Sequence, residues 1–396
     1  MTSAISRISH LVCSSCGSAY SAFTSQTTSP CCSMPLAGMY DVKEPLSKKE
    51  LPNREATMWR YREMLPVLED DNIVSLGEGF TPILKLNNLA SRYDLSHLLL
   101  KDEGKNPTGS FKARGLSMAI SKAKEFGAEG CIVPTAGNAG VAMSAYCAKA
   151  GMRAVVVMPS HTPKAFKEEC YWYGAEVVLV DGLINDCAAK AKELNADGRL
   201  LDVSTLKEPY RLEGKKTMGY EIAEQQDWQL PDVILYPAGG GTGLIGIWKA
   251  FKEMKSLGWL RADVKLPRMV AVQAANCSPL LDTFTGRQQN CLHYTGKPTI
   301  ANGLAVPRPL GEQMMLQVLR ESGGTAIGIT EEEMLLGLQE LGKHEGLFVA
   351  PEGAAVWMAT RKLLQNEVIA PEEKILLLNT GSGQKYMANI EGRYTL

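Results

Sequence analysis

The feature that most constrains this chain is a repeated alternation of short apolar runs and longer amphipathic stretches. Seven apolar runs are bounded by turn-forming residues and have the length of strands: 97–101, 130–135, 153–159, 176–181, 232–239, 268–274 and 374–381. The stretches between them, such as 110–127 and 138–151, have helical periodicity. Strands that alternate with helices form parallel sheets covered on both faces. We therefore predict the α/β class with mainly parallel sheets.

Length and charge narrow the possible functions. The 396 residues exceed one ordinary hydrophobic core, so two packed domains with a small appendage are expected. Lys plus Arg number 42 and Asp plus Glu 43, and this near-neutral balance argues against a nucleic-acid partner bound through bulk charge. No apolar run reaches the roughly 20 residues of a membrane helix, and residues 1–15 lack the apolar core of a secretory signal. A cytoplasmic protein without a membrane partner is predicted.

Three unusual loops follow predicted strands and therefore meet at one edge of the fold, where α/β proteins bind ligands. The loop after the strand at 232–239 contains Gly239, Gly240, Gly241, Thr242 and Gly243 and leads into an apolar helix. Glycines let backbone N–H groups crowd around an anion, and the helix start adds positive charge, so a phosphate group is the expected occupant. The run lacks the Lys of a nucleoside triphosphate loop and the spacing of a dinucleotide fold. The alternative is a tight turn without a ligand.

Lys112 is the candidate nucleophile. It lies in the first turn of the helix predicted over 110–127, where Thr108 and Ser110 are candidate caps. The positive end of a helix lowers the pKa of an amine, and the neutral amine attacks carbonyl groups. On its own, such a lysine is more often a surface charge. Together with a phosphate-binding loop, it suggests pyridoxal phosphate, with the aldehyde on Lys112 and the phosphate on the glycine loop.

The other two loops supply partners for the ring of such a cofactor. Asn138, in the loop "TAGNAG" at 135–140, can donate its amide to the ring hydroxyl, although it could also be only a turn residue. Thr380 or Ser382, in the loop after the last strand, can offer a hydroxyl to the ring nitrogen. A hydroxyl partner leaves that nitrogen largely unprotonated, which suits elimination and replacement better than transamination. Glu352 could line the same site or could be an ordinary acid at a helix start.

Five motifs in one order carry a resemblance to a known family. They are "GEGFTP" (77–82), "KDEGKNPTGSFKARG" (101–115), "TAGNAGVAMSAYCAKAG" (135–151), "RLEGKKTMGYEIAEQ" (211–225) and "TGSGQKY" (380–386). Together they resemble the threonine synthases, which are type II pyridoxal-phosphate enzymes related to the tryptophan synthase β chain. The resemblance covers about residues 70–390. It implies that Lys112 is the Schiff-base lysine, that Asn138 meets the ring hydroxyl, that residues 239–243 hold the phosphate, and that Thr380 meets the ring nitrogen.

The resemblance also implies a fold and a reaction. The fold is two three-layer α/β/α domains: a large one from residues 46–94 and 204–396, a small one from 95–203, and a Cys-rich segment over 1–45 in front. The reaction is a lyase-type conversion of O-phospho-L-homoserine and water to L-threonine and phosphate, and a homodimer follows by analogy. Lys101, Ser110 and Arg114 are candidates for the substrate's phosphate. The main-chain amides of Thr135, Ala136 and Gly137 are candidates for its carboxylate.

A related activity stays open at this point. The motif "FKARG" and the loop "GGGTG" are closer to the serine and threonine ammonia-lyases, which use the same lysine for β-elimination. Another β- or γ-substituted amino acid is therefore the main rival substrate. A binding module without chemistry is a third possibility, against which Lys112 argues.

The first 45 residues hold a separate group of cysteines. Cys13 and Cys16 form a C-x-x-C pair, and Cys31 and Cys32 follow where a second pair would complete a zinc ribbon. Ser29 occupies the position expected for the third ligand. The segment is therefore either a structural zinc site or a degenerate ribbon without metal. The other six cysteines lie in apolar contexts and are predicted to be buried thiols.

Overall fold

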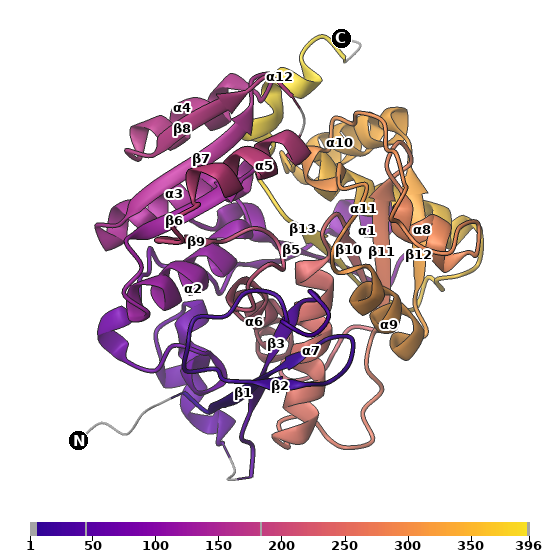
Figure 1. The fold of residues 1–396 in the computed structure, drawn as a ribbon. Helices are drawn as coiled ribbons and strands as arrows, with labels where there is room; N and C mark the ends of the chain where they lie inside the picture. The colour runs from indigo at the N-terminus through magenta and orange to yellow at the C-terminus, as the bar shows by residue number, and fades with distance from the viewer. Residues whose placement is uncertain (1–5, 44–45, 183, 394–396) are drawn as a thin grey trace.

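The computed structural model describes residues 6–43, 46–182 and 184–393. It contains a small three-stranded sheet of β1–β3, a six-stranded sheet of β4, β5 and β10–β13, and a four-stranded sheet of β6–β9, which lie between β5 and β10 in the sequence (Figure 1). All seven strands predicted from the sequence are present, and the helices predicted over 110–127 and 138–151 are α2 (Lys112–Glu125) and α3 (Asn138–Ala150). No helix in the described part of the chain combines the length and apolar character needed to cross a membrane.

The six-stranded sheet forms the centre of the larger unit. Its order is β12-β11-β10-β13-β5-β4, and all neighbours are parallel except β4, which runs antiparallel to β5. The strands are β4 (Ile83–Lys85), β5 (His97–Asp102), β10 (Val233–Pro237), β11 (Arg268–Ala274), β12 (Thr325–Ile329) and β13 (Lys374–Asn379). The sequence analysis placed β5 in the unit over 95–203, but β5 pairs with β13 and β4 in this sheet.

Two hydrophobic cores lie on opposite faces of this sheet, because successive side chains of a strand point to opposite sides. Ile234 and Tyr236 of β10 belong to one core, and Val233 and Leu235 belong to the other. The first core contains residues of α6 (Tyr210–Gln225), α7 (Thr242–Ser256) and α9 (Glu312–Ser322). The second contains residues of α1 (Asn87–Arg92), α10 (Glu331–Glu345) and α11 (Pro351–Gln365). The short helix α8 (Pro279–Phe284) contributes Leu280 to the first core, and Ile390 of α12 (Met387–Ile390) packs against the second.

The four-stranded sheet belongs to the smaller unit at the upper left of Figure 1. Its order is β8-β7-β6-β9, and every pair is parallel. The strands are β6 (Gly130–Pro134), β7 (Arg153–Pro159), β8 (Glu176–Val180) and β9 (Leu200–Asp202). Helices α2, α3 and α4 (Lys164–Trp172) pack on one face, and α5 (Ile184–Leu194) packs on the other. Helix α2 also packs against α6, so this pair of helices joins the two units.

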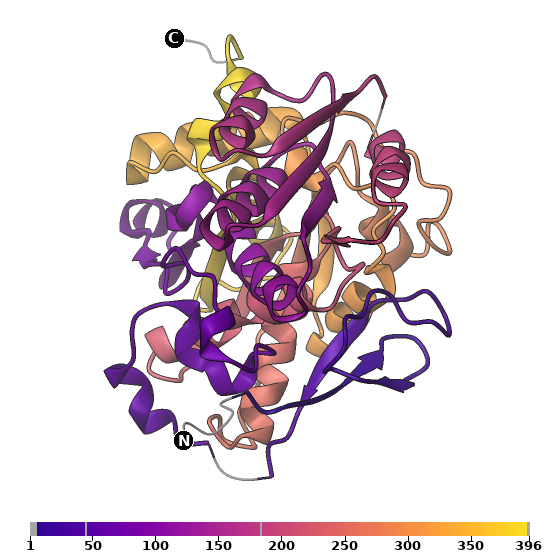
Figure 2. The ribbon, with the colours of Figure 1, turned by 60° about the vertical axis from the view of Figure 1, so that its left-hand side comes forward.

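The amino-terminal segment forms an antiparallel sheet of β1 (Ile8–Cys13), β2 (Ala19–Tyr20) and β3 (Leu36–Tyr40) at the edge of the molecule (Figure 2). It contacts the larger unit through α6, because Gly38 N and the Tyr40 hydroxyl both donate to the Glu213 carboxylate, at 3.0 and 2.9 Å. Short 3₁₀ helices connect the main elements: η1 (Lys48–Asn53), η2 (Met58–Met64), η3 (Asp70–Asn72), η4 (Glu103–Lys105), η5 (Pro107–Gly109), η6 (Asn302–Leu304) and η7 (Gly383–Tyr386).

Candidate active site

Lys112 is the first residue of α2, and the loop in front of it is held by the loop that follows β13. Phe111 N donates to Thr380 O at 3.1 Å, and Ser382 N donates to Gly109 O at 2.9 Å. The lysine is half-buried, and burial together with the charge of Arg211 lowers its pKa to about 7, against a smaller opposing effect of Glu352. At neutral pH a large fraction of this amine is therefore unprotonated and nucleophilic.

The expected helix caps of α2 are absent. Phe111 is the N-cap residue and makes no side-chain hydrogen bond to the helix, and the hydroxyls of Thr108 and Ser110 have no partner. Thr108 has a φ of 61°, a left-handed conformation that threonine rarely adopts. The prediction that these two residues cap the helix is wrong, because Phe111 occupies the N-cap position and neither hydroxyl donates to or accepts from the first turn of α2. Their unpaired hydroxyls remain free to meet a ligand.

The glycine loop lies between β10 and α7, as the sequence predicts. No described residue accepts a hydrogen bond from the backbone N–H groups of Gly239, Gly240 or Gly241. Gly241 has a φ of 76°, and a Cβ on it would lie 2.1 Å from the Met315 sulfur. A Cβ on Gly239 would lie 2.1 Å from the carbonyl oxygen of Gly303. Only glycine fits at these two positions. The free N–H donors of the loop lie at the amino-terminal, positive end of a fifteen-residue helix, α7.

Asn138 begins α3 and belongs to a chain of three polar side chains. Its Nδ2 donates to the Tyr386 hydroxyl at 3.2 Å, and that hydroxyl donates to Glu352 Oε1 at 2.9 Å. Gly303 N donates to the same carboxylate oxygen at 2.7 Å. Asn138 Oδ1 and Glu352 Oε2 have no partner, and burial raises the pKa of Glu352. Glu352 therefore lies in the first turn of α11 and also contacts the candidate site residue Asn138 through Tyr386, a residue that the sequence analysis did not single out.

The loop after β6 offers fewer amides than the sequence suggested. Thr135 N donates to Val157 O at 2.9 Å, and Gly137 N donates to the Thr135 hydroxyl at 3.2 Å. Of the three expected main-chain donors, only that of Ala136 has no acceptor among the described residues. A carboxylate bound here would therefore meet the Ala136 amide first.

Lys101 and Arg114 are not available for a substrate. Both side chains are fully buried in a cluster with Glu103 and Glu221, in which Lys101 Nζ lies 2.9 Å from Glu221 and Arg114 contacts both carboxylates at 2.5 to 2.7 Å. The carboxylates keep the pKa of Arg114 well above its usual value, against the effect of burial. This network corrects the expectation that Lys101 and Arg114 bind a substrate phosphate, because two positive charges are already balanced by two negative ones.

Two other buried cations have no such balance. Arg211 and Lys215 lie one turn apart on α6, and neither has a carboxylate within ion-pair distance among the described residues. Arg211 Nη1 donates to Val203 O at 2.5 Å, whereas its Nε and Lys215 Nζ have no partner. Both residues lie in the motif "RLEGKKTMGYEIAEQ". Their i, i+4 spacing places them on one face of the helix, and this signal could have identified them as a pair of candidate anion-binding residues.

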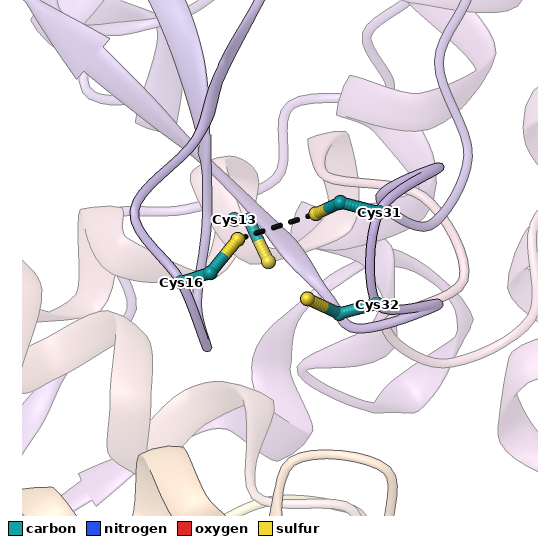
Figure 3. Close-up of side chains that lie close together, drawn as sticks. All are labelled: Cys13, Cys16, Cys31 and Cys32. Carbon is teal, nitrogen blue, oxygen red and sulfur yellow. Dashed lines mark hydrogen bonds between the residues drawn. The ribbon is translucent and has the colours of Figure 1, made fainter.

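The four amino-terminal cysteines lie together at one end of the small sheet (Figure 3). Their sulfur atoms all lie within 4.8 Å of one another, and those of Cys16 and Cys31 are 3.2 Å apart. Ser29 is buried, and its hydroxyl lies 3.2 Å from the Cys13 sulfur, so it supports the cluster without replacing a cysteine. The remaining six cysteines are free and buried, which confirms that prediction.

Comparison with known proteins now identifies the family. A family model described as a pyridoxal-phosphate dependent enzyme matches residues 74–381. The chain belongs to this family. Within it, threonine synthase of Methanocaldococcus jannaschii is 34% identical over 377 residues, covering 94% of this chain and 92% of the relative. Threonine synthase of Methanosarcina acetivorans is 33% identical and covers 94% and 91%. The chain is therefore a member of the threonine synthase branch of the pyridoxal-phosphate-dependent enzymes.

Solved structures agree on the fold of this pyridoxal-phosphate-dependent enzyme. A bacterial structure described as a threonine deaminase is 25% identical, with a TM-score of 0.64 over 76% of this chain and 92% of that chain. Maize serine racemase gives a TM-score of 0.66 at 20% identity, over 76% and 88%, and therefore supports the fold alone. The type II fold predicted from the sequence is confirmed.

Proposed function

We propose that this chain is a threonine synthase, converting O-phospho-L-homoserine and water to L-threonine and phosphate. The observation that carries the proposal is Lys112, an amine with a pKa of about 7 at the start of α2, in a chain about one-third identical to threonine synthases over nearly its whole length. We also propose that Lys112 binds the aldehyde of pyridoxal phosphate, that residues 239–243 bind its phosphate, and that Asn138 and Thr380 contact its ring.

The residues present fit this cofactor. The free N–H groups of Gly239–Gly241 and the start of α7 suit a phosphate, and Asn138 has an unpaired amide oxygen beside Tyr386. When bound, pyridoxal phosphate supplies an electron-withdrawing ring that stabilises negative charge on the carbon atoms of an amino acid. The hydroxyl of Thr380, rather than a carboxylate, would meet the ring nitrogen.

The chain's own groups would then bind the substrate and move protons. The Lys112 amine would take a proton from the α carbon and carry protons at the β carbon, for which a pKa near neutral is suitable. Arg211 and the Ser110 hydroxyl would bind the substrate phosphate, since both have unpaired donors. The Ala136 amide would hold the substrate carboxylate.

Two incubations test the proposal. The purified holoenzyme should release phosphate from O-phospho-L-homoserine and form threonine without a 2-oxo acid. Incubation with L-threonine addresses the alternative, an ammonia-lyase, which the "GGGTG" loop and the threonine deaminase fold favour. Formation of 2-oxobutyrate and ammonia from threonine, without phosphate release from the first substrate, would overturn the assignment. Lys112→Ala serves as the control without the catalytic amine.

We further propose that Cys13, Cys16, Cys31 and Cys32 bind one structural zinc ion. In a tetrahedral zinc–thiolate site the sulfurs lie about 3.8 Å apart, and these four are all within 4.8 Å of one another. Metal analysis should give one zinc per chain, and Cys16→Ser with Cys31→Ser should remove it. Cys187→Ala, at a buried cysteine in α5, is the matched control and should retain the metal. A homodimer and a cytoplasmic location remain predictions.

A further inference from the structure

Lys215 is a buried cation for which the fold supplies no partner. Seven lysine and arginine side chains are almost fully buried in the described part of the chain: Arg60, Lys101, Arg114, Lys122, Arg211, Lys215 and Lys216. Five of them form ion pairs with glutamates, and Arg211 donates to a backbone carbonyl. Lys215 Nζ alone in this set has no hydrogen-bond acceptor. Buried amines normally have one, so this exception needs an explanation.

The side chain of Lys215 points toward the start of α2. Its Nζ lies 3.8 Å from the centre of the Phe111 ring, and Lys112 Nζ lies 4.0 Å from the centre of the same ring. A Cβ on Gly115 would lie 2.7 Å from Lys215 Cε, so any larger residue on α2 would displace the lysine. The sequence thus keeps space for a long cationic side chain next to the proposed catalytic amine.

The charges around Lys215 are unfavourable to a second cation. Lys112 on α2 and Arg211 on α6 repel a proton on Lys215, whereas Glu208, before α6, and Glu103 in η4 favour one without contacting the amine. Burial and the two cations hold the pKa of Lys215 well below its usual value. The attraction of the Phe111 ring is too weak to replace hydration of the charge. Burial and these two cations therefore favour the neutral form of the Lys215 amine while no anion is bound.

We propose that Lys215 recognises the anionic group on the side chain of the substrate and takes up one proton from solvent when that anion binds. The inference rests on the proposed function, because it assigns the substrate phosphate a second partner beside Arg211. A dianion is the suitable ligand, since Arg211 and a protonated Lys215 supply two positive charges on adjacent turns of one helix. Free phosphate, the product, has the same chemistry and is expected to bind the same residues.

Sulfate is the probe of choice, because it is a dianion that does not itself titrate near neutral pH. We would titrate sulfate into the holoenzyme at pH 8 by calorimetry, in two buffers with different ionisation enthalpies, and count the protons exchanged. The parent enzyme should take up about one proton per sulfate. Lys215→Met should take up none and bind sulfate about tenfold or more weakly, because a charged hydrogen bond is lost.

The controls separate binding from folding. Lys215→Met should retain the visible absorption of the bound cofactor and its thermal midpoint, since an apolar residue replaces an unpaired amine. Lys207→Met removes a partly exposed lysine just before α6 and should leave sulfate binding and proton uptake unchanged. Lys215→Gln, which fills the same space with a neutral donor, should also lose the proton uptake.

Three results would overturn the inference: no proton uptake by the parent enzyme, equal sulfate affinity in Lys215→Met, or loss of the cofactor from Lys215→Met. The last would mean that the lysine holds the phosphate of pyridoxal phosphate instead. In Lys215→Met, a tenfold or larger rise in KM for O-phospho-L-homoserine and in the inhibition constant for inorganic phosphate would support the proposed role of Lys215 in binding the substrate anion. The sulfate titration requires no turnover, so it can be interpreted even if the enzyme does not catalyse the proposed reaction. Equally, a negative sulfate titration would leave the assay of the proposed reaction unaffected.

Discussion

Two groups of charged side chains, buried or half-buried, involve the same pair of helices, α2 and α6, and they differ in whether carboxylates balance their cations. The paired cluster contains Lys101, Glu103, Arg114 and Glu221, in which two cations meet two carboxylates at 2.5 to 2.9 Å. The open cluster contains Lys112, Arg211 and Lys215, and no carboxylate lies within ion-pair distance of these three among the described residues. Arg114 and Lys112 are only two positions apart on α2.

The presence or absence of a counter-charge distinguishes charged residues that stabilise the fold from those that are available to a ligand. A buried ion pair with its hydrogen bonds complete is stable only as a set, and it offers nothing to a ligand. A buried cation without a counter-charge is unstable unless it loses its proton or binds an anion from outside. The low pKa of Lys112, at about 7, fits the second case. The open cluster is therefore where substrate and cofactor chemistry is expected.

The largest effect is expected from Lys112→Ala. Removal of the amine that binds the cofactor and carries protons should lower turnover by at least about a thousandfold. The thermal midpoint should stay near that of the parent, because the Lys112 side chain makes no hydrogen bond or ion pair with any residue that the structure describes. Phosphate release and calorimetric melting measure the two quantities. A variant that keeps near-normal turnover would show that the open cluster is not catalytic.

The next largest effect is expected from breaking the paired cluster. Arg114→Met leaves two buried carboxylates, Glu103 and Glu221, to share the single charge of Lys101, which should reduce the free energy of unfolding by about 3–5 kcal/mol. Urea denaturation measures the loss. Arg153→Met is the matched control: its ion pair with Glu176 is about half exposed, so its removal should cost at most about 1 kcal/mol. Equal losses in both variants would contradict the distinction between the clusters.

A third variant, Arg211→Met, removes a cation of the open cluster. Arg211→Met should weaken binding of the phosphate-bearing substrate by about ten- to a hundredfold in KM, because a charged hydrogen bond contributes about 1.5–3 kcal/mol. Stability should fall much less than in Arg114→Met, since Arg211 has no ion pair to break. Steady-state kinetics and urea denaturation, measured on both variants, give the contrast. A large loss of stability with unchanged KM would place Arg211 with the structural charges.

Local patterns were enough to predict much of this fold and site. Strand length, helical spacing and glycine loops are properties of neighbouring residues, and they gave the seven strands and the positions of α2 and α3. The short strands β4, β9 and β12 were missed, because three to five residues carry little periodicity. The paired cluster could not be predicted, since Lys101, Arg114 and Glu221 are distant in sequence and meet only when α2 packs on α6. The same holds for the contact of Tyr386 with Asn138.

The smallest effect tests the pKa that distinguishes the open cluster. In the enzyme freed of cofactor, the rate at which Lys112 reacts with an amine-specific acylating reagent should rise with pH and level off above about pH 7, because only the neutral amine reacts. Lys164, whose side chain is 84% exposed, serves as the reference for a solvent-exposed amine. Peptide mass mapping after brief labelling measures both in one sample. Glu352→Gln removes the carboxylate that raises the pKa of Lys112, so the midpoint of Lys112 labelling should move to lower pH. If the labelling rates of Lys112 and Lys164 depended on pH in the same way, the Lys112 amine would be hydrated like a surface lysine, and the open cluster would lose its electrostatic basis.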